Sequence, residues 1–295
     1  MKNNFLILKI IIVMIAFSAN SLLCRVALKD AHIDSLTFSM IRIVSGAVAL
    51  LPLLLRRHHH IQFKKIHVIS GISLTVYIVA FSLAYEQIDA GIGALILFGV
   101  VQLTMIIYGL CKGEILSRIK LTGLLFAFGG LVYLLIPSSV STIHLPLLNV
   151  IFMALSGFAW AVYSLAGNSK GSMPVNTAYN FLLAVPAGAV ILLIVSLLMP
   201  GDYHADMHGI ILAVLSGAVA SAGSYYLWYS VLPYIESITA STVQLSVPCL
   251  SIFLAVLFIG ETLTTQIIIA TTLVLTGIFI VIKDRKKKVR TRTER

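Results

Sequence analysis

Among the carboxamide side chains within long apolar stretches of the sequence, the best candidates to bind a solute are Asn20, Gln102 and Gln244. A carboxamide both donates and accepts hydrogen bonds, so these residues suit a neutral or zwitterionic molecule. Polar side chains are costly inside a membrane and usually face the interior of a helix bundle. A hydrogen bond between neighbouring helices is the structural alternative for each of them.

Aromatic side chains form the second group of candidates. Tyr77 and Trp160 lie within predicted membrane spans, and we expect both to line a cavity. Tyr163 and Tyr226 are further candidates, although an aromatic belt at the membrane surface explains their positions as well. The expected binding surface therefore combines amide groups with aromatic rings.

Arg42 is the one charged residue that lies well inside a predicted span, roughly two helical turns from its outer end. It could attract a substrate carboxylate or gate the outer mouth of a pathway. The structural alternative is an arginine that extends toward the membrane surface or pairs with Glu86, Asp89 or Glu261. Glu86 is likewise either a gating partner or a carboxylate that faces water.

The 11 acidic residues of the chain are distributed unlike those of a proton pump. Every one falls in a predicted loop, at a span end or in the C-terminal tail. A proton-coupled exporter of cations keeps a carboxylate at mid-membrane, where it binds protons and cations in turn. The sequence therefore favours a neutral or zwitterionic solute that moves by facilitation or exchange.

We expect no catalytic residue, no metal ion and no cofactor. The sequence lacks a nucleophile elbow, a paired-histidine zinc motif and a phosphate-binding loop. Three consecutive histidines, His58 to His60, cannot easily converge on one ion from a short loop. Cys24, Cys111 and Cys249 stand singly in or beside apolar stretches, which is typical of small buried residues.

The composition indicates which elements must position these side chains. Of the 295 residues, 59% are hydrophobic and only 11% are charged, whereas soluble chains are nearer half apolar and about a quarter charged. Intrinsic disorder is excluded as well, because it requires low hydrophobicity and many charges. The chain therefore belongs mostly in lipid, and the class of protein is integral to the membrane.

Hydropathy predicts an all-α membrane protein with ten transmembrane helices, since each span needs about 20 apolar residues. The alternating segments of a membrane β-barrel are absent. The predicted spans are residues 5–24, 36–55, 68–85, 90–110, 119–136, 147–167, 176–199, 209–232, 236–258 and 265–282.

Lysine and arginine set the orientation of the spans, because basic residues concentrate in cytoplasmic loops. If the N-terminus is cytoplasmic, 18 of the 21 lysines and arginines lie on the cytoplasmic side. The exceptions are Arg25 and Lys29 in an outer loop and Arg42 within a span. We therefore expect both termini in the cytoplasm and the protein in the inner, cytoplasmic membrane. The basic tail acts as a topology anchor on the lipid bilayer, so no nucleic-acid partner is expected.

The two halves of the chain repeat. A shift of 147 residues superposes Gly113-Glu114 on Gly260-Glu261 and Gly130 on Gly277 without a gap. Each unit holds five spans, and because five is odd the second unit must enter the membrane inverted. Basic residues flank Glu114 but not Glu261, as opposite sides of the membrane require. The predicted units are 1–143, 144–283 and a basic tail of 284–295.

Inverted repeats are typical of transporters, because two similar halves can exchange conformations and open one central site to either side. Such sites lie near mid-membrane where glycine or proline interrupts helices in corresponding positions. These interruptions are the glycines of the fourth span and Pro248 of the ninth. The fourth span has Val101 where the ninth has Pro248, so only the ninth has a proline break.

At this level of detail the chain resembles the EamA-like exporter branch of the drug/metabolite transporter superfamily. Each half carries a Gly-Glu pair after its fourth span, Arg42 matches the arginine of the family's second span, and Trp160 matches its sixth-span tryptophan. The second-repeat signature is similar to residues 227–233, 244–248 and 258–264. The resemblance covers essentially the whole chain and implies export of small solutes, without specifying which.

The sequence thus predicts a secondary transporter that exports a small neutral or zwitterionic metabolite, such as an amino acid or a related compound, by alternating access. Proton-coupled drug efflux is one alternative, and a non-transporting scaffold or receptor is another. A membrane enzyme is disfavoured, because no cluster of catalytic acids or histidines lies at depth. The expected partners are a small-molecule substrate and the lipid bilayer, and both a monomer and a homodimer remain open.

Overall fold

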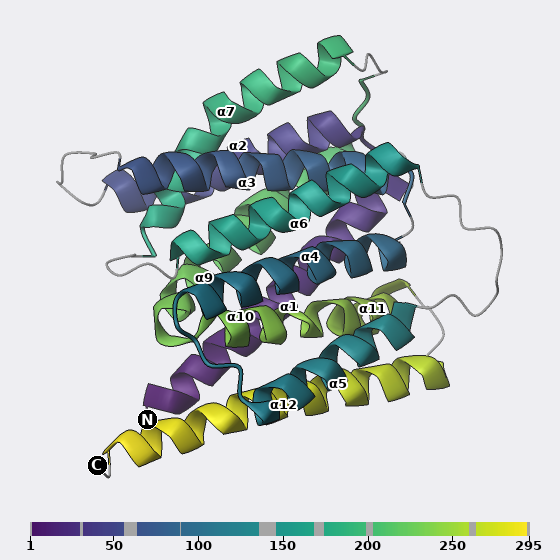
Figure 1. Ribbon diagram of the computed structural model, residues 1–295. Coiled ribbons are helices and arrows are strands. Elements are labelled where there is room, and N and C mark those ends of the chain that lie inside the picture. Colours follow the sequence, from purple (N-terminus) through teal and green to yellow (C-terminus); the bar gives the residue numbers. More distant parts are fainter. Residues whose placement is uncertain are drawn as a thin grey trace.

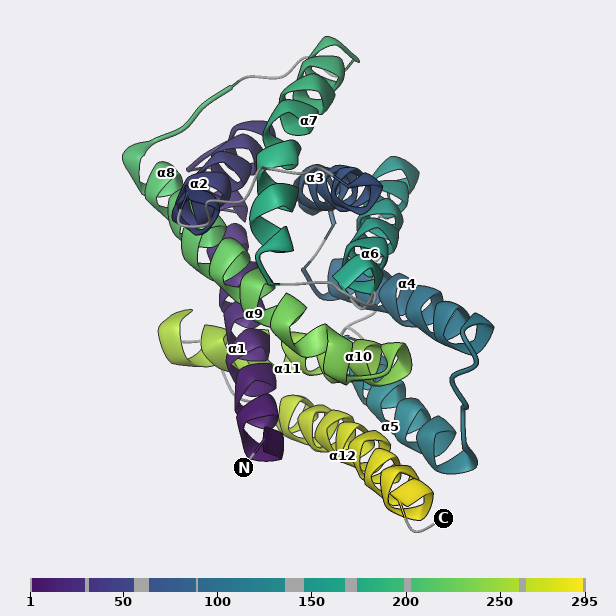
Figure 2. The same cartoon turned by 90° about the vertical axis from the view of Figure 1, so that its left-hand side faces the viewer.

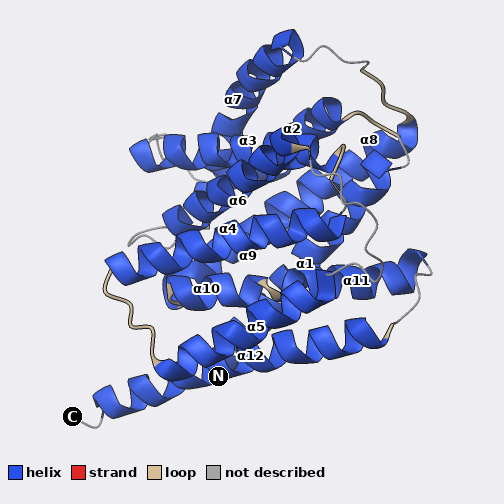
Figure 3. Cartoon of the chain, turned by 45° about the vertical axis from the view of Figure 1, so that its right-hand side comes forward, coloured by secondary structure: helices blue, strands red, loops and turns tan. Residues whose placement is uncertain are grey.

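Long apolar stretches fold into helices here because, in lipid, a helix satisfies its backbone hydrogen bonds within one segment. A computed structural model of the protein describes residues 2–29, 32–55, 64–88, 90–135, 146–167, 174–198, 203–259 and 264–293. Over these ranges the chain is helical apart from short connections (Figure 3). The β-type pairing within these ranges is one isolated antiparallel bridge between Ile33 and Ala205.

Ten helical stretches follow one another along the described chain. Two of them, the eighth and ninth spans, contain other helix types or a break, so several labels share one span. The elements are α1 (Lys2–Lys29), α2 (Ser35–Leu55), α3 (Lys65–Tyr85), α4 (Ala90–Cys111), α5 (Arg118–Leu135), α6 (Leu147–Gly167), α7 (Asn176–Leu198), α8 (Met207–Val214), η1 (Leu215–Gly223), α9 (Ser224–Val231), η2 (Leu232–Tyr234), α10 (Ser237–Gln244), α11 (Ser246–Ile259) and α12 (Thr265–Thr293).

The predicted all-helical class is confirmed for these residues. Nine of the described stretches are long and apolar enough to cross a membrane. The fifth predicted span, α5, is the shortest stretch at 18 residues and is not among the nine. It begins with the basic residues Arg118 and Lys120 and runs beside α12 (Figure 1).

Helix α3 is the most enclosed of the nine candidate spans. In its most apolar window 72% of the residues are buried, against 17% in α7. Helix α3 packs between α6 and α7, whereas α7 carries exposed leucines along its outer surface (Leu193, Leu197 and Leu198). The core therefore lies around α3 and α6, and α7 presents an apolar face that suits lipid.

Helices α5 and α12 form a contact with approximate two-fold symmetry. A Cβ added to Gly123 would lie 2.8 Å from the carbonyl oxygen of Gly277, and one added to Gly130 would lie 2.9 Å from that of Ala270. Under the 147-residue shift, Gly123 corresponds to Ala270 and Gly130 to Gly277, so each contact is the symmetry mate of the other. The two helices run antiparallel, as an axis in the membrane plane requires (Figures 1 and 2).

The remaining helices pack across the two repeats in matching pairs. Helix α1, the first of its repeat, packs on α11 and on α9, which belong to the fourth and third spans of the other repeat. Its counterpart α6 packs on α4 and α3 in the same way. The centre of the protein is therefore built from both halves, and neither half encloses it alone.

Two irregularities interrupt the second repeat. The eighth span changes from α-helix to π-helix at η1 and back to α-helix at α9. The ninth span breaks at Leu245 between α10 and α11. Pro248 lacks the backbone N–H that would bond to the carbonyl of Gln244, and its ring clashes with that carbonyl, so the helix ends at Gln244.

Several boundaries differ from those expected. Helix α1 runs from Lys2 to Lys29 and α12 continues to Thr293, both beyond the predicted spans, because their polar ends are themselves good helix formers. His58 to His60, Asp89 and Glu261 lie outside the described residues.

Candidate functional site

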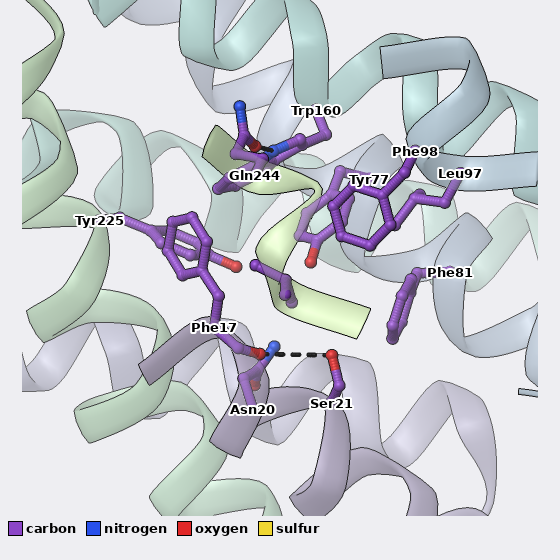
Figure 4. Close-up of a pocket in the computed structure, with 11 residues that line it drawn as sticks. Phe17, Asn20, Ser21, Tyr77, Phe81, Leu97, Phe98, Trp160, Tyr225 and Gln244 are labelled. Carbon is purple, nitrogen blue, oxygen red and sulfur yellow. Dashed lines mark hydrogen bonds between the residues drawn. The ribbon is translucent and has the colours of Figure 1, made fainter. Parts of the chain in front are cut away.

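A small cavity lies at the junction of the two repeats (Figure 4). Its volume is about 30 Å³, which is room for about one or two water molecules. Helices α1, α3 and α4 of the first repeat and α6, α9, α10 and α11 of the second contribute to it. Its lining consists of Phe17, Asn20, Ser21, Tyr77, Phe81, Leu97, Phe98, Trp160, Tyr225, Gln244 and Val247.

Gln244 and Trp160 contact each other across this cavity. The indole Nε1 of Trp160 donates a hydrogen bond to Oε1 of Gln244 at 2.5 Å. The amide nitrogen of Gln244 donates to the carbonyl of Ala240 at 3.2 Å and lies 3.8 Å from the sulfur of Met105. Gln244 is the last residue of α10, so the helix break places its amide at the cavity wall.

Aromatic rings fill most of the remaining wall. The ring of Trp160 lies 4.8 Å from that of Tyr77, 4.9 Å from Tyr225 and 5.3 Å from Phe17, measured between centroids. In Figure 4 the hydroxyl groups of Tyr77 and Tyr225 extend toward each other across the cavity. The site thus offers ring faces and two phenolic hydroxyls to a bound molecule.

Asn20 contributes an amide from α1. Its Oδ1 accepts a hydrogen bond from the hydroxyl of Ser216 in η1 at 2.6 Å. The hydroxyl of Ser18, also in α1, donates to the carbonyl of Val247 at 3.1 Å. This bond gives a partner to a carbonyl beside the break in the ninth span. Helix α1 is therefore fixed to both irregular segments of the second repeat.

A second polar cluster adjoins the cavity beyond Trp160. The ring of Tyr163 lies 5.5 Å from Trp160 and 5.0 Å from Tyr229. The hydroxyl of Tyr229 donates to the carbonyl of Tyr163 at 2.9 Å and accepts from Nδ2 of Asn180 at 3.2 Å. The hydroxyl of Tyr163 and Oδ1 of Asn180 are buried without a hydrogen-bond partner, so this cluster has unused polar capacity.

Arg42 is completely buried in α2, with 0% of its surface exposed. Its Nε donates to the hydroxyl of Ser221 at 2.9 Å, and its Nη2 donates to the hydroxyl of Tyr225 at 2.8 Å. It neither reaches the membrane surface nor contacts Glu86, which instead accepts a hydrogen bond from Ser35. Asp89 and Glu261, the other two partners considered, lie outside the described residues.

Two other predicted candidates, Gln102 and Tyr226, are not among the residues that line the cavity. Gln102 is 3% exposed, and neither its amide nitrogen nor its oxygen has a hydrogen-bond partner. Tyr226 is partly buried against the core and does not line the cavity, whereas its neighbour Tyr225 does. Gln102 and Tyr226 therefore stay predictions, without a place in the cavity of this conformation.

Tyr225 could not be predicted as a cavity residue from the sequence, because a π-helix precedes it. A π-turn carries more residues than an α-turn, so residues after η1 are rotated relative to a regular helix. Phe17, Phe81 and Phe98 were missed because a phenylalanine in an apolar helix has no polar signal that separates cavity from core or lipid. The proline break was the one local signal that pointed to this region, through Gln244.

Polar contacts join the helices on the predicted cytoplasmic side. The carboxylate of Glu114 accepts hydrogen bonds from the backbone N–H groups of Ser237 at 2.7 Å and Ile238 at 3.0 Å, at the start of α10. Lys120, which is 1% exposed, pairs with Glu236 beside them. Because a carboxylate at a helix N-terminus is stabilised by the N–H groups and the helix dipole, these contacts hold the two repeats together on this side.

The opposite side is joined by different contacts. Glu86, after α3, accepts a hydrogen bond from Ser35 at the start of α2. Asp206 caps α8 by accepting from the N–H of Gly209 at 2.7 Å, and it pairs with Nδ1 of His32 at 2.7 Å. These two hydrogen bonds lower the pKa of the Asp206 carboxyl group.

The donor set favours binding over chemistry. Among the described residues, no group of three or more histidine, cysteine or acidic side chains could hold a metal ion. The described lining contains amides, hydroxyls and rings but no carboxylate. Such a wall can hold a polar organic molecule through neutral hydrogen bonds, and it offers no acid for proton transfer.

Comparison with known proteins relates this architecture to one family. A model of the EamA-like transporter family matches residues 4–136 and 147–283. An uncharacterized protein of Pseudomonas aeruginosa is 41% identical over 285 residues, which cover 97% of each chain. A probable amino-acid metabolite efflux pump of Salmonella typhimurium is 26% identical over 223 residues, which cover 71% of this chain and 74% of that one.

A solved crystal structure of a protein has the same fold, with a TM-score of 0.74 at 18% sequence identity over 91% of this chain and 97% of that one. The predicted fold of two five-helix repeats is thereby confirmed. Because the family model covers both repeats, the chain belongs to the EamA-like transporter family and is a multi-pass membrane transporter.

Proposed function

We propose that the protein exports a small neutral or zwitterionic metabolite, an amino acid or a related compound, across the inner membrane by alternating access. Family membership supports transport. The relative named as an amino-acid metabolite efflux pump supports the substrate class. The proposal is secondary transport with both termini in the cytoplasm, as the distribution of lysine and arginine favours.

One observation carries the proposal: the cavity lies where helices of both repeats meet. Residues from three helices of the first repeat and four of the second line it, and the α5–α12 contact relates the halves by an approximate two-fold axis. A site on such an axis becomes accessible from either side when the halves exchange conformations.

In this conformation the cavity is too small to hold a substrate. A volume of about 30 Å³ is far below the roughly 300–1,000 Å³ of pockets that hold drug-sized ligands. Trp160 and Gln244 satisfy each other's hydrogen bonds here. A substrate must therefore separate α6 from α10 and replace this bond, so that Gln244 and Trp160 become its own partners.

The contacts at the two sides act as gates in this scheme. To open toward the predicted cytoplasmic side, the protein must release Glu114 from the start of α10 and separate Lys120 from Glu236. To open toward the other side, it must separate Ser35 from Glu86 and His32 from Asp206. Each gate consists of a few polar contacts, which water can replace when the gate opens.

Transport is proposed to proceed without protons. The described lining has no carboxylate that could bind a proton and a substrate in turn. Proton-coupled drug efflux is the competing function, and it predicts acidification of the lumen that follows substrate movement. A non-transporting scaffold predicts no flux at all.

Flux in proteoliposomes tests these alternatives. Purified full-length protein is expected to exchange labelled amino acids from a mixture of the twenty, with no dependence on an imposed pH gradient. Gln244→Ala and Trp160→Phe should each lower the initial rate at least tenfold, about 1.4 kcal/mol. Gln266→Ala, which changes an amide of α12 that bonds to the carbonyl of Tyr133 far from the cavity, is the matched control. Equal rates for all three variants and wild type would refute the site.

A further inference from the structure

The guanidinium of Arg42 is a buried charge that pairs with no acidic side chain among the described residues. Its two hydrogen-bond partners, Ser221 and Tyr225, are both neutral hydroxyl groups. Its third nitrogen, Nη1, is buried and has no hydrogen-bond partner at all. Burial of an unpaired charge is costly, whereas a charge that is paired and fully hydrogen-bonded is tolerated.

Carboxylates among the described residues do not fill this role. Glu86 accepts from Ser35, Asp206 pairs with His32, and Asp34 accepts from the backbone at the start of α2. None of these groups contacts the guanidinium. Helix α2 therefore carries a buried cation, and the Nη1 group of this cation has no hydrogen-bond acceptor in this conformation.

The guanidinium borders the cavity of the proposed site. It lies over the ring of Tyr77, 5.5 Å from the centroid, and it donates to the hydroxyl of Tyr225. Both tyrosines line the cavity, and their hydroxyls extend into it (Figure 4). The Tyr225 oxygen accepts from Arg42, and its hydroxyl is also hydrogen-bonded to that of Tyr77. A bound carboxylate can take the place of Tyr77 and accept the Tyr225 proton.

The surrounding helices fix the guanidinium in place. The π-helix η1 carries Ser221, and Tyr225 follows directly in α9. A Cβ added to Gly217 of η1 would lie 2.3 Å from the carbonyl oxygen of Arg42, so only glycine allows this close approach of η1 to α2. Two helices of opposite repeats thus hold one cation and one phenol at the same edge of the cavity.

We infer that Arg42 binds the carboxylate of the transported molecule, with Tyr225 as a second donor to the same group. The inference rests on the proposed function and narrows its substrate class to carboxylate-bearing solutes, either zwitterions or monoanions. An ammonium group on a zwitterion has no carboxylate partner in the described lining, so the faces of Trp160 and Phe17 receive it. A molecule without a carboxylate leaves the arginine unpaired and binds weakly.

Matched pairs of solutes test the carboxylate directly. The probes are the L-amino acids and, for each, the corresponding carboxamide, which keeps the skeleton and removes the negative charge. Wild-type protein in proteoliposomes should transport at least one amino acid with a kcat/KM at least tenfold higher than that of its carboxamide. Equal values for acid and amide overturn the inference while transport itself stands. A protein that moves none of the probes overturns the proposed function as well.

Variants assign the preference to Arg42. Arg42→Lys keeps the charge but loses the planar fork, and it should reduce the preference for acid over amide about tenfold. Tyr225→Phe deletes only the second donor and should raise KM for the acid severalfold without a comparable change for the amide. Tyr108→Phe, which removes a hydroxyl from the exposed face of α4, is the control. If both variants lower the rates for acid and amide equally, the arginine is structural and the inference is overturned. If Arg42→Lys fails to fold, the same comparison with Tyr225→Phe alone decides.

Discussion

The fourth spans of the two repeats are counterparts in sequence but differ in structure. Helix α4 runs without interruption from Ala90 to Cys111, whereas its counterpart breaks at Leu245 into α10 and α11. Val101 stands in the first where Pro248 stands in the second. The broken helix supplies the amide of Gln244 to the cavity, and the unbroken one supplies only the apolar side chains of Leu97 and Phe98.

The α5–α12 contact shows the opposite behaviour. There the two repeats use corresponding small residues to make corresponding contacts. The halves are thus alike where they pack on each other and unlike where they face the cavity. Symmetry serves the exchange of conformations, while recognition of an asymmetric molecule requires the polar groups to differ between the halves.

Introducing a proline into the unbroken helix is the strongest test of this difference. Val101→Pro should destabilise the protein by about 3 kcal/mol or more, because the carbonyl of Leu97 loses its hydrogen bond. A Cβ added to Gly157 of α6 would lie 2.7 Å from this carbonyl, so a kink here also disturbs the α4–α6 contact. Thermal unfolding in detergent measures the effect, with Val101→Ala as control. Unchanged stability would mean that the two spans are interchangeable.

Removing the proline from the broken helix tests the converse. Pro248→Val should leave the folded protein at least as stable, because a full hydrogen-bond ladder becomes possible across Gln244. Transport should fall at least tenfold, since a continuous helix turns the Gln244 amide away from Trp160. Initial rates in proteoliposomes measure this, and Pro233→Ala, at an exposed proline in η2, is the control. Full activity would show that the break is dispensable.

The two buried glutamines provide a smaller test. Gln102 in α4 has no hydrogen-bond partner, and burial of an unpaired amide costs about 1–3 kcal/mol. Gln102→Leu should therefore raise the unfolding temperature by a few degrees and change transport less than twofold, unlike Gln244→Ala. If transport collapses instead, Gln102 binds solute in another conformation and the repeats are more alike than this structure indicates.

The third spans of the repeats begin with different caps, and this predicts a modest pH effect. In α8 the carboxylate of Asp206 accepts from Gly209 and His32, which lowers its pKa. A lowered pKa in the folded state means that the stabilisation is complete above the ordinary pKa near 3.8 and is lost as the pH falls through the lowered value. Asp206→Asn should flatten the acid side of a plot of unfolding temperature against pH. Asp34→Asn, which leaves the contact between Asp206 and His32 in place, is the control. An unaltered acid limb in Asp206→Asn contradicts the cap.

Sequence predicted the helical spans well because apolar length is a local property. It also singled out Gln244, Trp160, Tyr77 and Asn20 as candidates within the spans, and the structure brings these four to one cavity. Which side of a uniformly apolar helix faces a cavity is a different question. Helix α4 is apolar on all sides, so nothing in its periodicity separates Gln102 from Leu97 or Phe98.

Arg42 shows why the rest required coordinates. Its partners Ser221 and Tyr225 are 179 and 183 residues away in the chain, and a π-helix sets their orientation. A hydropathy profile contains neither the π-helix nor the pairing of α2 with η1. The sequence therefore identified an unusual arginine but not its surroundings.

The small size of the cavity has a consequence for the energy balance of the cell. One or two waters cannot form a hydrogen-bonded file through a hydrocarbon layer about 30 Å thick. Protons that hop along water chains therefore cannot cross the bilayer through the water of this cavity alone. A cavity of this size favours a resting transporter that leaves the electrochemical potential of the membrane intact.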